Sequence, residues 1–150
     1  MAFDALEAHL KSLGIAPLGD AFEPIAADVW QPIEAAVGGH FPPVVRWLFE
    51  RFGGFQFKGG ALYDSPRHRE ILFGWFMAGA ELADAYDDTR DSMPDPFVPL
   101  VHDGGGNYLS VDLASGAIAF WVHDALRDRN VEPVAASAEA FFLSLYKEPG

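Results

Sequence analysis

Apolar residues near the start of the chain recur at the spacing of an α-helix. Leu6, Leu10 and Leu13 fall on one face of a helix predicted over residues 3–14. Gly14 follows them and suits the end of a helix, because glycine readily adopts the left-handed conformation that closes many helices. The sequence therefore predicts an amphipathic first helix.

Two more helices are predicted downstream, over residues 28–39 and 42–54. Pro32 and Pro43 each fall in a first turn, where the missing backbone N–H is tolerated. Glycines close both segments, and Gly53 ends the second. We expect the two helices to form a helical hairpin.

The pattern then changes from helical spacing to the aromatic and β-branched runs that favour strands. The predicted elements are, in order, two short strands around Gly59 and Gly60, a strand over 69–78, a helix over 79–93, three strands within 97–124, and a helix over 134–148 capped by Ser137. Helices at both ends and adjacent strands between them indicate one α+β domain over residues 1–150. We expect a mostly antiparallel, mixed sheet packed against N-terminal helices and a C-terminal helix.

The alternation within residues 108–124 predicts a hairpin with a definite register. The predicted pairs are Leu113 with Ile118, Val111 with Phe120, and Leu109 with Val122. This register buries these six residues on one face. The other face would carry Tyr108, Ser110 and Asp112 opposite His123, Trp121 and Ala119. We interpret that second face as polar and aromatic.

A run of glycines precedes this hairpin. The motif is Asp103, Gly104, Gly105, Gly106 and Asn107. It comes before a strand, lacks the spaced glycine of a dinucleotide fingerprint and lacks the Gly-Lys-Ser/Thr of a P-loop. We interpret the motif as structural, a tight strand entry in which the side chains of Asp103 and Asn107 bond local backbone groups.

Histidines and acids near the hairpin raise the question of metal binding or catalysis. His102 and His123 lie beside aspartates, but no two histidines have the spacing of a convincing metal site. The segment 87–95 lacks the glycine and ligand positions of a calcium loop, and no serine stands in a nucleophile elbow. We therefore expect no catalytic residue, no metal and no cofactor.

The net charge of the chain limits the kinds of partner that the protein can bind. The chain has 22 acidic and 10 basic residues, for a net charge of −12. This excess argues against nucleic acid as a partner, because phosphate binding requires a basic face. Between residues 71 and 126, nine acids stand against one base, Arg90. The surface there is either simply solubilising or a landing site for a basic protein.

Composition also bears on location. The chain has no cysteine, its longest apolar run is far shorter than the roughly 20 residues of a membrane helix, and its first residues do not resemble a signal peptide. We expect a cytoplasmic protein without a membrane partner.

The acidic helix and the hairpin supply the candidate partner-binding residues. They are Glu81, Asp84, Asp88 and Asp91 along one helix stripe, with Tyr108, Asp112, Trp121, His123 and Asp124 from the hairpin. Asp95 is a further candidate beside the stripe. We expect Tyr108 or Trp121 to be exposed and to anchor the contact, because aromatic side chains dominate many protein interfaces.

Three blocks of the sequence resemble a known family. They are IEAAVGGHFPPVVRWLFERFGG (33–54), FVPLVHDGGGNYLSVDL (97–113) and GAIAFWVHD (116–124), followed by a short strand and a terminal helix. Together they resemble the SUKH superfamily over residues 28–146, which leaves 1–27 as an N-terminal helical extension. Two positions depart from its pattern: Phe41 stands before Pro42 where leucine is usual, and Phe52 precedes Gly53 where asparagine is frequent.

The resemblance implies a SUKH-like fold and a noncatalytic protein binder. Many members are immunity proteins that neutralise a toxin, often a nuclease, of a polymorphic or contact-dependent toxin system. Other members are fungal cell-wall synthesis regulators, which leaves a regulatory scaffold that docks signalling or cell-wall enzymes as an alternative. A hydrolase that uses His123 and Asp112 is a third.

Overall fold

The computed structural model describes residues 3–17, 27–78, 81–94, 96–103, 106–122 and 131–147. Within them lie five helices: α1 (Asp4–Ser12), α2 (Ala27–Val37), α3 (Pro43–Phe52), α4 (Glu81–Thr89) and α5 (Ala138–Ser144). The strands are β1 (Ile15–Pro17), β2 (Phe55–Tyr63), β3 (Ile71–Phe76), β4 (Phe97–His102), β5 (Tyr108–Asp112), β6 (Ile118–Trp121) and β7 (Val131–Ala135). The five expected helices and the α+β class are confirmed.

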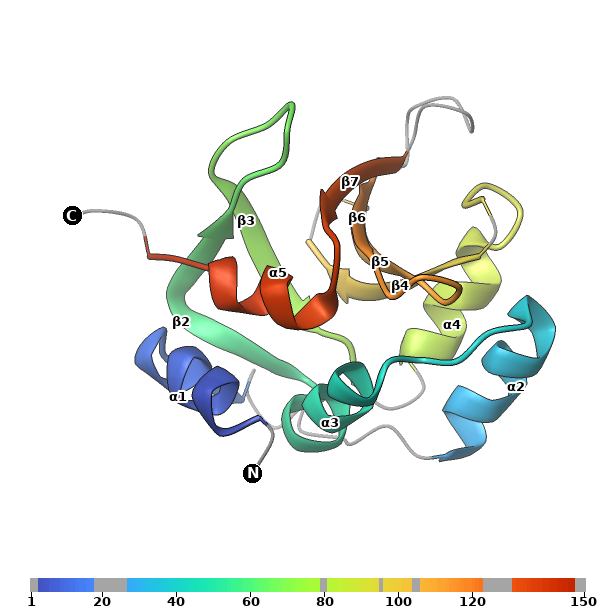
Figure 1. The fold of residues 1–150 in the computed structure, drawn as a ribbon, viewed down its shortest axis with the longest axis horizontal. Helices are drawn as coiled ribbons and strands as arrows, with labels where there is room; N and C mark the ends of the chain where they lie inside the picture. The colour runs from blue at the N-terminus through green and yellow to red at the C-terminus, as the bar shows by residue number, and fades with distance from the viewer. Residues whose placement is uncertain are drawn as a thin grey trace.

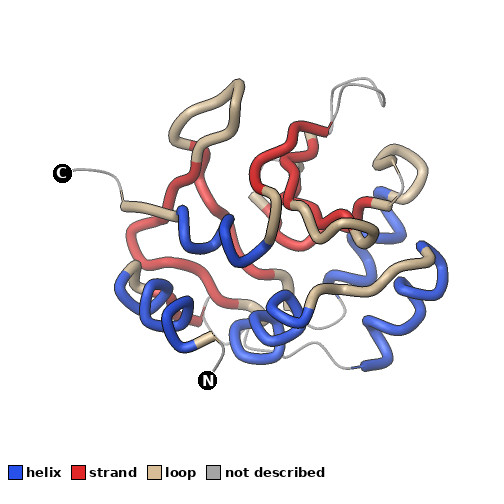
Figure 2. Tube along the Cα trace, in the orientation of Figure 1, coloured by secondary structure: helices blue, strands red, loops and turns tan. Residues whose placement is uncertain are grey.

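All seven strands form one sheet in which each strand pairs with its neighbour in sequence, in the order β1 to β7. Every pair is antiparallel, so the sheet is not mixed. Figure 1 shows how strongly the sheet curves between β3 and β7. Figure 2 shows that the loop joining β2 to β3 and the start of β7 project on the same side of the molecule.

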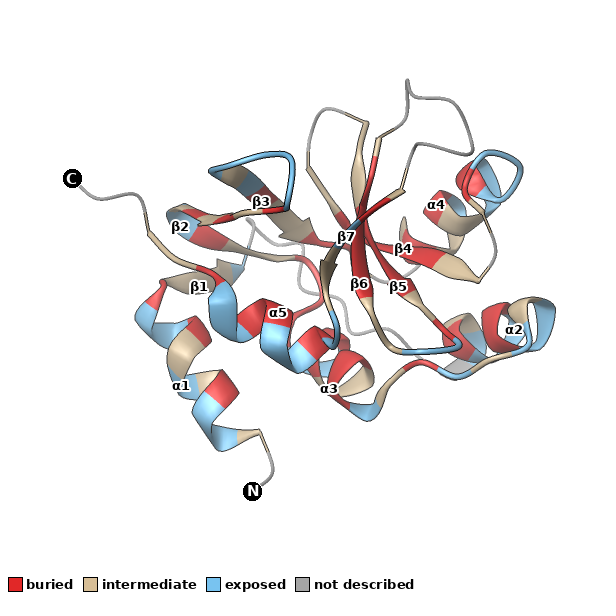
Figure 3. Cartoon of the chain, turned by 45° about the horizontal axis from the view of Figure 1, so that its top comes forward, coloured by how far each residue is buried: buried red, intermediate tan, exposed pale blue. Residues whose placement is uncertain are grey.

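Helices cover both faces of the sheet. On one side α1 and α3 pack against α5, and on the other α4 packs against β4, with α2 beside it (Figure 1). Figure 3 shows that the buried residues gather on the strands and on the helix sides that face them. Much of the core is aromatic: Phe142 of α5 lies 5.5 Å from Phe76 and 6.0 Å from Phe73 between ring centroids.

Local sequence explains the helix limits. Pro43 begins α3, where its missing N–H is harmless. Ser137 caps α5, and its Oγ accepts a hydrogen bond from the backbone N–H of Ala140 at 3.1 Å. Trp30 of α2 meets Phe49 of α3 edge to face at 6.0 Å, so the two expected hairpin helices do touch.

The segment around Gly59 and Gly60 is one strand and not two. Both glycines have positive φ, and the pairing of β2 with β3 shifts register between Gln56 and Ala61. The glycines therefore make a bulge within a strand that continues past them. A short strand that was not among the predicted elements, β1, follows α1 and pairs with β2.

The β5–β6 hairpin has a different register from the expected one. Leu109 pairs with Phe120 and Val111 pairs with Ile118, a shift of two residues. A shift of two keeps each side chain on its face, so Val111 and Phe120 are buried at 0% and 7% exposure, as expected. Alternation fixes the face of a residue but not its partner across the strands.

The turn accounts for the shift in register. Oδ1 of Asp112 accepts hydrogen bonds from the backbone N–H groups of Ala114 at 2.7 Å and Ser115 at 3.2 Å, and Gly116 has φ +83°. The turn therefore takes up Leu113, which the expected register had placed in the strand pair.

Gly74 lets β3 approach β4 closely. A Cβ added at this position would lie 1.7 Å from the carbonyl oxygen of His102. The neighbouring residue, Trp75, then pairs directly with His102 across the two strands. Glycine at this point therefore sets where the side chain of Trp75 lies.

Candidate partner-binding surface

The apolar side of α4 lies on the sheet. Leu82, Ala85 and Thr89 are buried, and the Thr89 hydroxyl donates to the carbonyl of Ala85 at 2.7 Å. Beyond the helix, Met93 is buried, and its sulfur accepts a hydrogen bond from Ser110 of β5 at 3.4 Å. The helix is thus fixed with its acidic residues turned away from the sheet.

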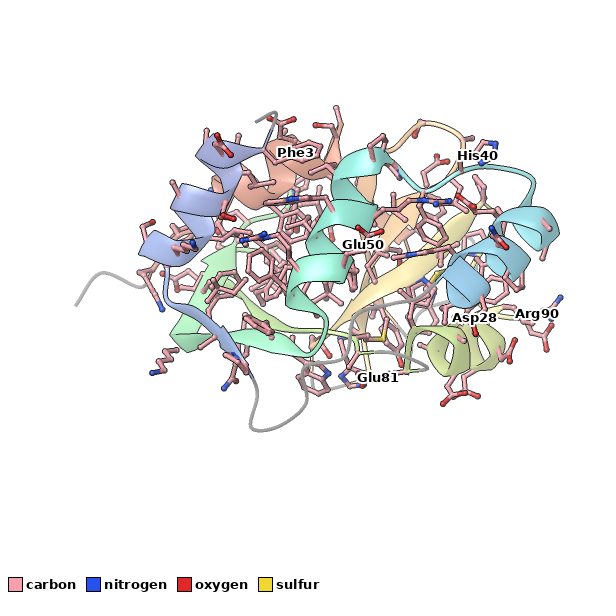
Figure 4. All side chains as sticks on the ribbon, turned by 90° about the horizontal axis from the view of Figure 1, so that it is seen from below. Phe3, Asp28, His40, Glu50, Glu81 and Arg90 are labelled. Atoms are coloured by element: carbon pink, nitrogen blue, oxygen red, sulfur yellow. The ribbon has the colours of Figure 1, made fainter. Side chains whose placement is uncertain are left out.

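The expected acidic stripe along α4 forms. Asp84, Asp88 and Asp91 are exposed, and Glu81 is half-buried at the start of the helix. Figure 4 shows this helix at the edge of the molecule, with Glu81 near one end and Arg90 near the other. Asp87 is also exposed, which adds a carboxylate that the stripe did not include.

Glu81 is fixed by contacts on both carboxylate oxygens. Its Oε2 accepts a hydrogen bond from Trp75 Nε1 at 3.2 Å, and its Oε1 accepts one from the backbone N–H of Ala78 at 3.1 Å. These contacts tie the first turn of α4 to the end of β3. Glu81 is therefore held against an aromatic ring.

Trp121 is not an exposed anchor. Its side chain is 4% exposed, and its Nε1 has no hydrogen-bond acceptor among the described residues. The expectation was wrong because the second face of the hairpin is covered as well: Ser110 donates to the buried Met93, and Ala119 is also buried. The sequence alternation could not show that both faces of this hairpin are covered.

Tyr108 is half-buried and belongs to a row of aromatic side chains across four strands. Trp75 stacks on His102 at 4.6 Å with an interplanar angle of 18°, His102 meets Tyr108 at 5.0 Å, and Tyr108 lies 5.9 Å from Trp121. Each contact joins residues paired on neighbouring strands. The aromatic row, defined as these four residues, was missed by sequence reasoning because its members come from separate strands.

Carboxylates surround the tyrosine of the row. Burial raises the pKa of Tyr108, and the negative charges of Asp88, Glu81 and Asp103 raise it further. Two carboxylates of the stripe, Glu81 and Asp88, therefore act electrostatically on the aromatic row through Tyr108.

A groove of about 250 Å³ lies between α2 and α4, on the other side of α4 from the row. Its apolar lining includes Ile33 and Tyr86, and Asp28 and Asp87 lie at it as well. Arg90 stands over the Tyr86 ring, 5.7 Å from its centroid. Asp87 therefore lies at the groove, whereas Asp88, which points about 100° away around the helix, does not line it.

The glycine-rich motif is partly described. Oδ1 of Asp103 accepts a hydrogen bond from the backbone N–H of Asn107 at 3.1 Å, the N–H of Asp103 donates to the carbonyl of Asn107 at 3.2 Å, and Gly106 has φ +91°. The Asp103 side chain thus bonds a local backbone group as expected, Asn107 takes part in these two bonds through its backbone, and the structural role of the whole motif stays a prediction. The motif residues Gly104 and Gly105 lie outside the described residues.

The remaining candidates have mixed outcomes. Asp112 shapes the β5–β6 turn through its carboxylate, which leaves a role in partner binding as a prediction. Asp95, His123 and Asp124 lie outside the described residues.

Two buried glutamates hold loops in place, and sequence reasoning missed both. Glu132 of β7 accepts hydrogen bonds from the Ser65 hydroxyl at 2.6 Å and the Arg67 N–H at 2.7 Å, and its Oε2 lies 3.0 Å from His68 Nδ1. Glu132 therefore joins β7 to the β2–β3 loop. Nothing in the spacing of these residues indicates the contact, because they lie more than 60 positions apart.

Glu34 of α2 makes the second of these polar clusters. Its carboxylate accepts hydrogen bonds from Arg46 at 2.5 Å and from the backbone N–H of Phe41 at 2.8 Å. Burial alone would raise the pKa of Glu34, but these hydrogen bonds outweigh it and hold the pKa below the ordinary value. Glu132 has a lowered pKa by the same balance, with burial opposed by Ser65, Arg67 and His68.

The Ser65, His68 and Glu132 cluster does not have the geometry of a catalytic triad. The Ser65 hydroxyl donates to the glutamate and not to the imidazole, so His68 is not placed between serine and carboxylate as the base of a triad is. Among the described residues, no three His, Asp or Glu side chains gather as metal ligands, and no helix is long and apolar enough to cross a membrane.

Comparison with known proteins identifies the fold's relatives. Residues 24–144 match the SMI1 / KNR4 family (SUKH-1). The SPbeta prophage-derived uncharacterized protein YokK of Bacillus subtilis (strain 168) is 35% identical over 87 residues, which are 57% of this chain and 45% of that protein. The match thus spans less than half the length of this relative. Because the family match covers most of the chain, the protein belongs to the SMI1/KNR4 (SUKH-1) family.

Proposed function

We propose that this protein is a noncatalytic protein-binding module that neutralises a cognate toxin in the cell that makes it. Family membership supports the proposal, since SUKH proteins are typically toxin immunity proteins. The observation that carries it for this chain is the exposed acidic stripe formed by Asp84 and Asp88 on α4 and Asp91 in the turn after it, with the charge of Asp88 acting on the half-buried Tyr108.

The charge of the chain fits a basic partner. A nuclease toxin needs a basic face to hold phosphates, so an inhibitor that covers this face gains from being acidic. The protein has a net charge of −12, and α4 places exposed carboxylates on both sides of one helix. Rim charges of this kind mainly accelerate association, whereas desolvated aromatic contacts mainly slow dissociation.

The direct test is binding to the product of the gene next to the one for this protein. The tagged full chain is mixed with that product, co-purified, and titrated by calorimetry. We expect a saturable complex, and we expect co-expression to restore growth of cells that produce the toxin. Absence of both binding and protection would contradict the proposal.

The alternative is a regulatory scaffold that docks signalling or cell-wall enzymes. The same experiment separates the two, because a scaffold would not restore growth in the presence of the toxin.

A further inference from the structure

The aromatic row offers a surface that a flat cation can use. Trp75 and His102 are stacked, Tyr108 adjoins His102, and all three are half-buried, so part of each side chain reaches solvent. The fourth member, Trp121, is buried and lies beside Tyr108 on the neighbouring strand. The row is therefore a firm aromatic platform and not a set of mobile side chains.

Carboxylates flank this platform. Glu81 is hydrogen-bonded to the Trp75 indole, which places its charge at one end of the row. Asp88 is exposed about two turns further along α4 than Glu81. Its charge acts on Tyr108 together with those of Glu81 and Asp103. The platform thus combines aromatic rings with negative charge at close range.

This combination matches the chemistry of a guanidinium group. A guanidinium is planar, stacks on aromatic rings and forms bidentate hydrogen bonds with carboxylates. An ammonium group is compact and strongly hydrated, so it gains less from a ring platform. We propose that Trp75, Tyr108, Glu81 and Asp88 form a subsite that holds an arginine side chain of the protein partner.

The inference rests on the proposed function, since it assigns a contact within a protein-binding surface. It goes further by naming the side chain that the partner inserts. It also assigns Asp88 and Asp87 to different surfaces, because the charge of Asp88 acts on Tyr108 whereas Asp87 lies at the α2–α4 groove. These neighbouring aspartates provide a matched pair of variants with the same change in charge.

The test uses nuclear magnetic resonance on the full chain labelled with nitrogen-15. The probe is N-acetyl-arginine amide, and the readout is the indole N–H signal of Trp75, assigned with the variant Trp75→Phe. We expect a saturable shift of this signal in the millimolar range. N-acetyl-citrulline amide, which has the same shape without the charge, should produce no saturable shift, and N-acetyl-lysine amide should bind more weakly than the arginine probe.

The variants locate the contact. Asp88→Asn should weaken binding of the arginine probe about threefold to fivefold, as expected for loss of one partly exposed ion pair. Asp87→Asn should leave the affinity within about 1.5-fold of the original value, since this exposed carboxylate lies at the α2–α4 groove and its charge is screened by solvent and salt. Tyr108→Leu should weaken binding through loss of the ring face, with the amide spectrum used to check that the variant is folded.

Several results would overturn the subsite. They are no saturable shift at Trp75, equal binding of the citrulline or lysine probe, or equal effects of the two aspartate variants. The outcome is independent of the test of function, because it needs no toxin. If the chain protects cells but does not bind the arginine probe, the subsite is wrong and the proposed function stands. If it binds the arginine probe but no toxin, the subsite stands and the proposed function is wrong.

Discussion

Gly74 is the residue at which the least change should have the greatest effect. We expect Gly74→Ala to lower the free energy of unfolding by about 3 kcal/mol or more, because the new Cβ would collide with the His102 carbonyl and push β3 from β4. Gly38→Ala is the matched control: Gly38 has φ +88° but no atom within 4 Å of an added Cβ. The strain of an alanine in the left-handed backbone conformation should by itself lower the free energy of unfolding by about 1 kcal/mol at Gly38. Urea unfolding compares the two, and equal losses would show that the close approach of the strands is not what Gly74 provides.

Phe120 tests the core of the hairpin. It is 7% exposed and its ring lies 6.4 Å from Tyr63 and 6.2 Å from His68. We expect Phe120→Ala to lower the free energy of unfolding by about 3 kcal/mol, through lost burial and the cavity left behind. Leu143→Ala, at a side chain 42% exposed, is the control and should cost less than about 1 kcal/mol. A small loss at Phe120 would mean that this part of the core repacks easily.

The helix α4 is the element that carries the charge prediction. We expect the double variant Asp84→Asn with Asp91→Asn to slow association with a basic toxin and to flatten its dependence on salt, because both carboxylates are exposed at the stripe. The dissociation rate should change little. The variant Glu50→Gln with Glu139→Gln removes the same charge from exposed positions on α3 and α5 and serves as the control. Surface binding kinetics across a salt series measures all rates, and unchanged association for the α4 variant would indicate a merely solubilising surface.

Elements were predictable from sequence to the extent that their signals are local. The spacing of Leu6 and Leu10, the proline at the start of α3 and the Ser137 cap each report on neighbouring residues, and all three helices form as expected. The strand through Gly59 and Gly60 was divided wrongly, because glycine marks a bulge as readily as a turn.

The candidate surface was predictable only in its charge. The stripe on α4 follows from helical periodicity, which the sequence displays. Which aromatic residues reach the surface depends on what packs above them, so Trp121 was wrongly expected to be exposed, and the row that joins Trp75, His102 and Tyr108 was missed. Contacts of this kind depend on which residues pair across neighbouring strands. The observed β5–β6 register differs from the expected one by two residues, so these pairs were not predicted.

At the scale of the whole molecule, Glu34 and Glu132 link stability to pH. Each has a folded-state pKa below the ordinary value of 4.5, so its stabilising contribution is fully present above that value and is lost as the pH falls through the lower folded-state pKa. We expect the free energy of unfolding to decline as the pH is lowered from about 5. Glu132→Gln should reduce stability at neutral pH and flatten this decline.

The control for this prediction is Glu50→Gln, which changes an exposed carboxylate on α3. It should leave both the stability at neutral pH and the steepness of the acid transition nearly unchanged. Urea unfolding at a series of pH values provides the measurement. An acid transition equally steep in the Glu132 variant would show that the link between β7 and the β2–β3 loop does not govern acid unfolding.

The position of α5 determines when the molecule can finish folding. Strand pairs in this sheet join neighbours in sequence and so close short loops, which favours rapid pairing. The rings of Phe141 and Phe142, however, pack on Tyr63 and Phe73 from the last helix of the chain. A polypeptide still being synthesised therefore exposes the aromatic side of its sheet until this helix leaves the ribosome, and such a surface is prone to aggregation. We therefore expect the domain to become stable only after α5, which follows every strand of the sheet in sequence, has been translated.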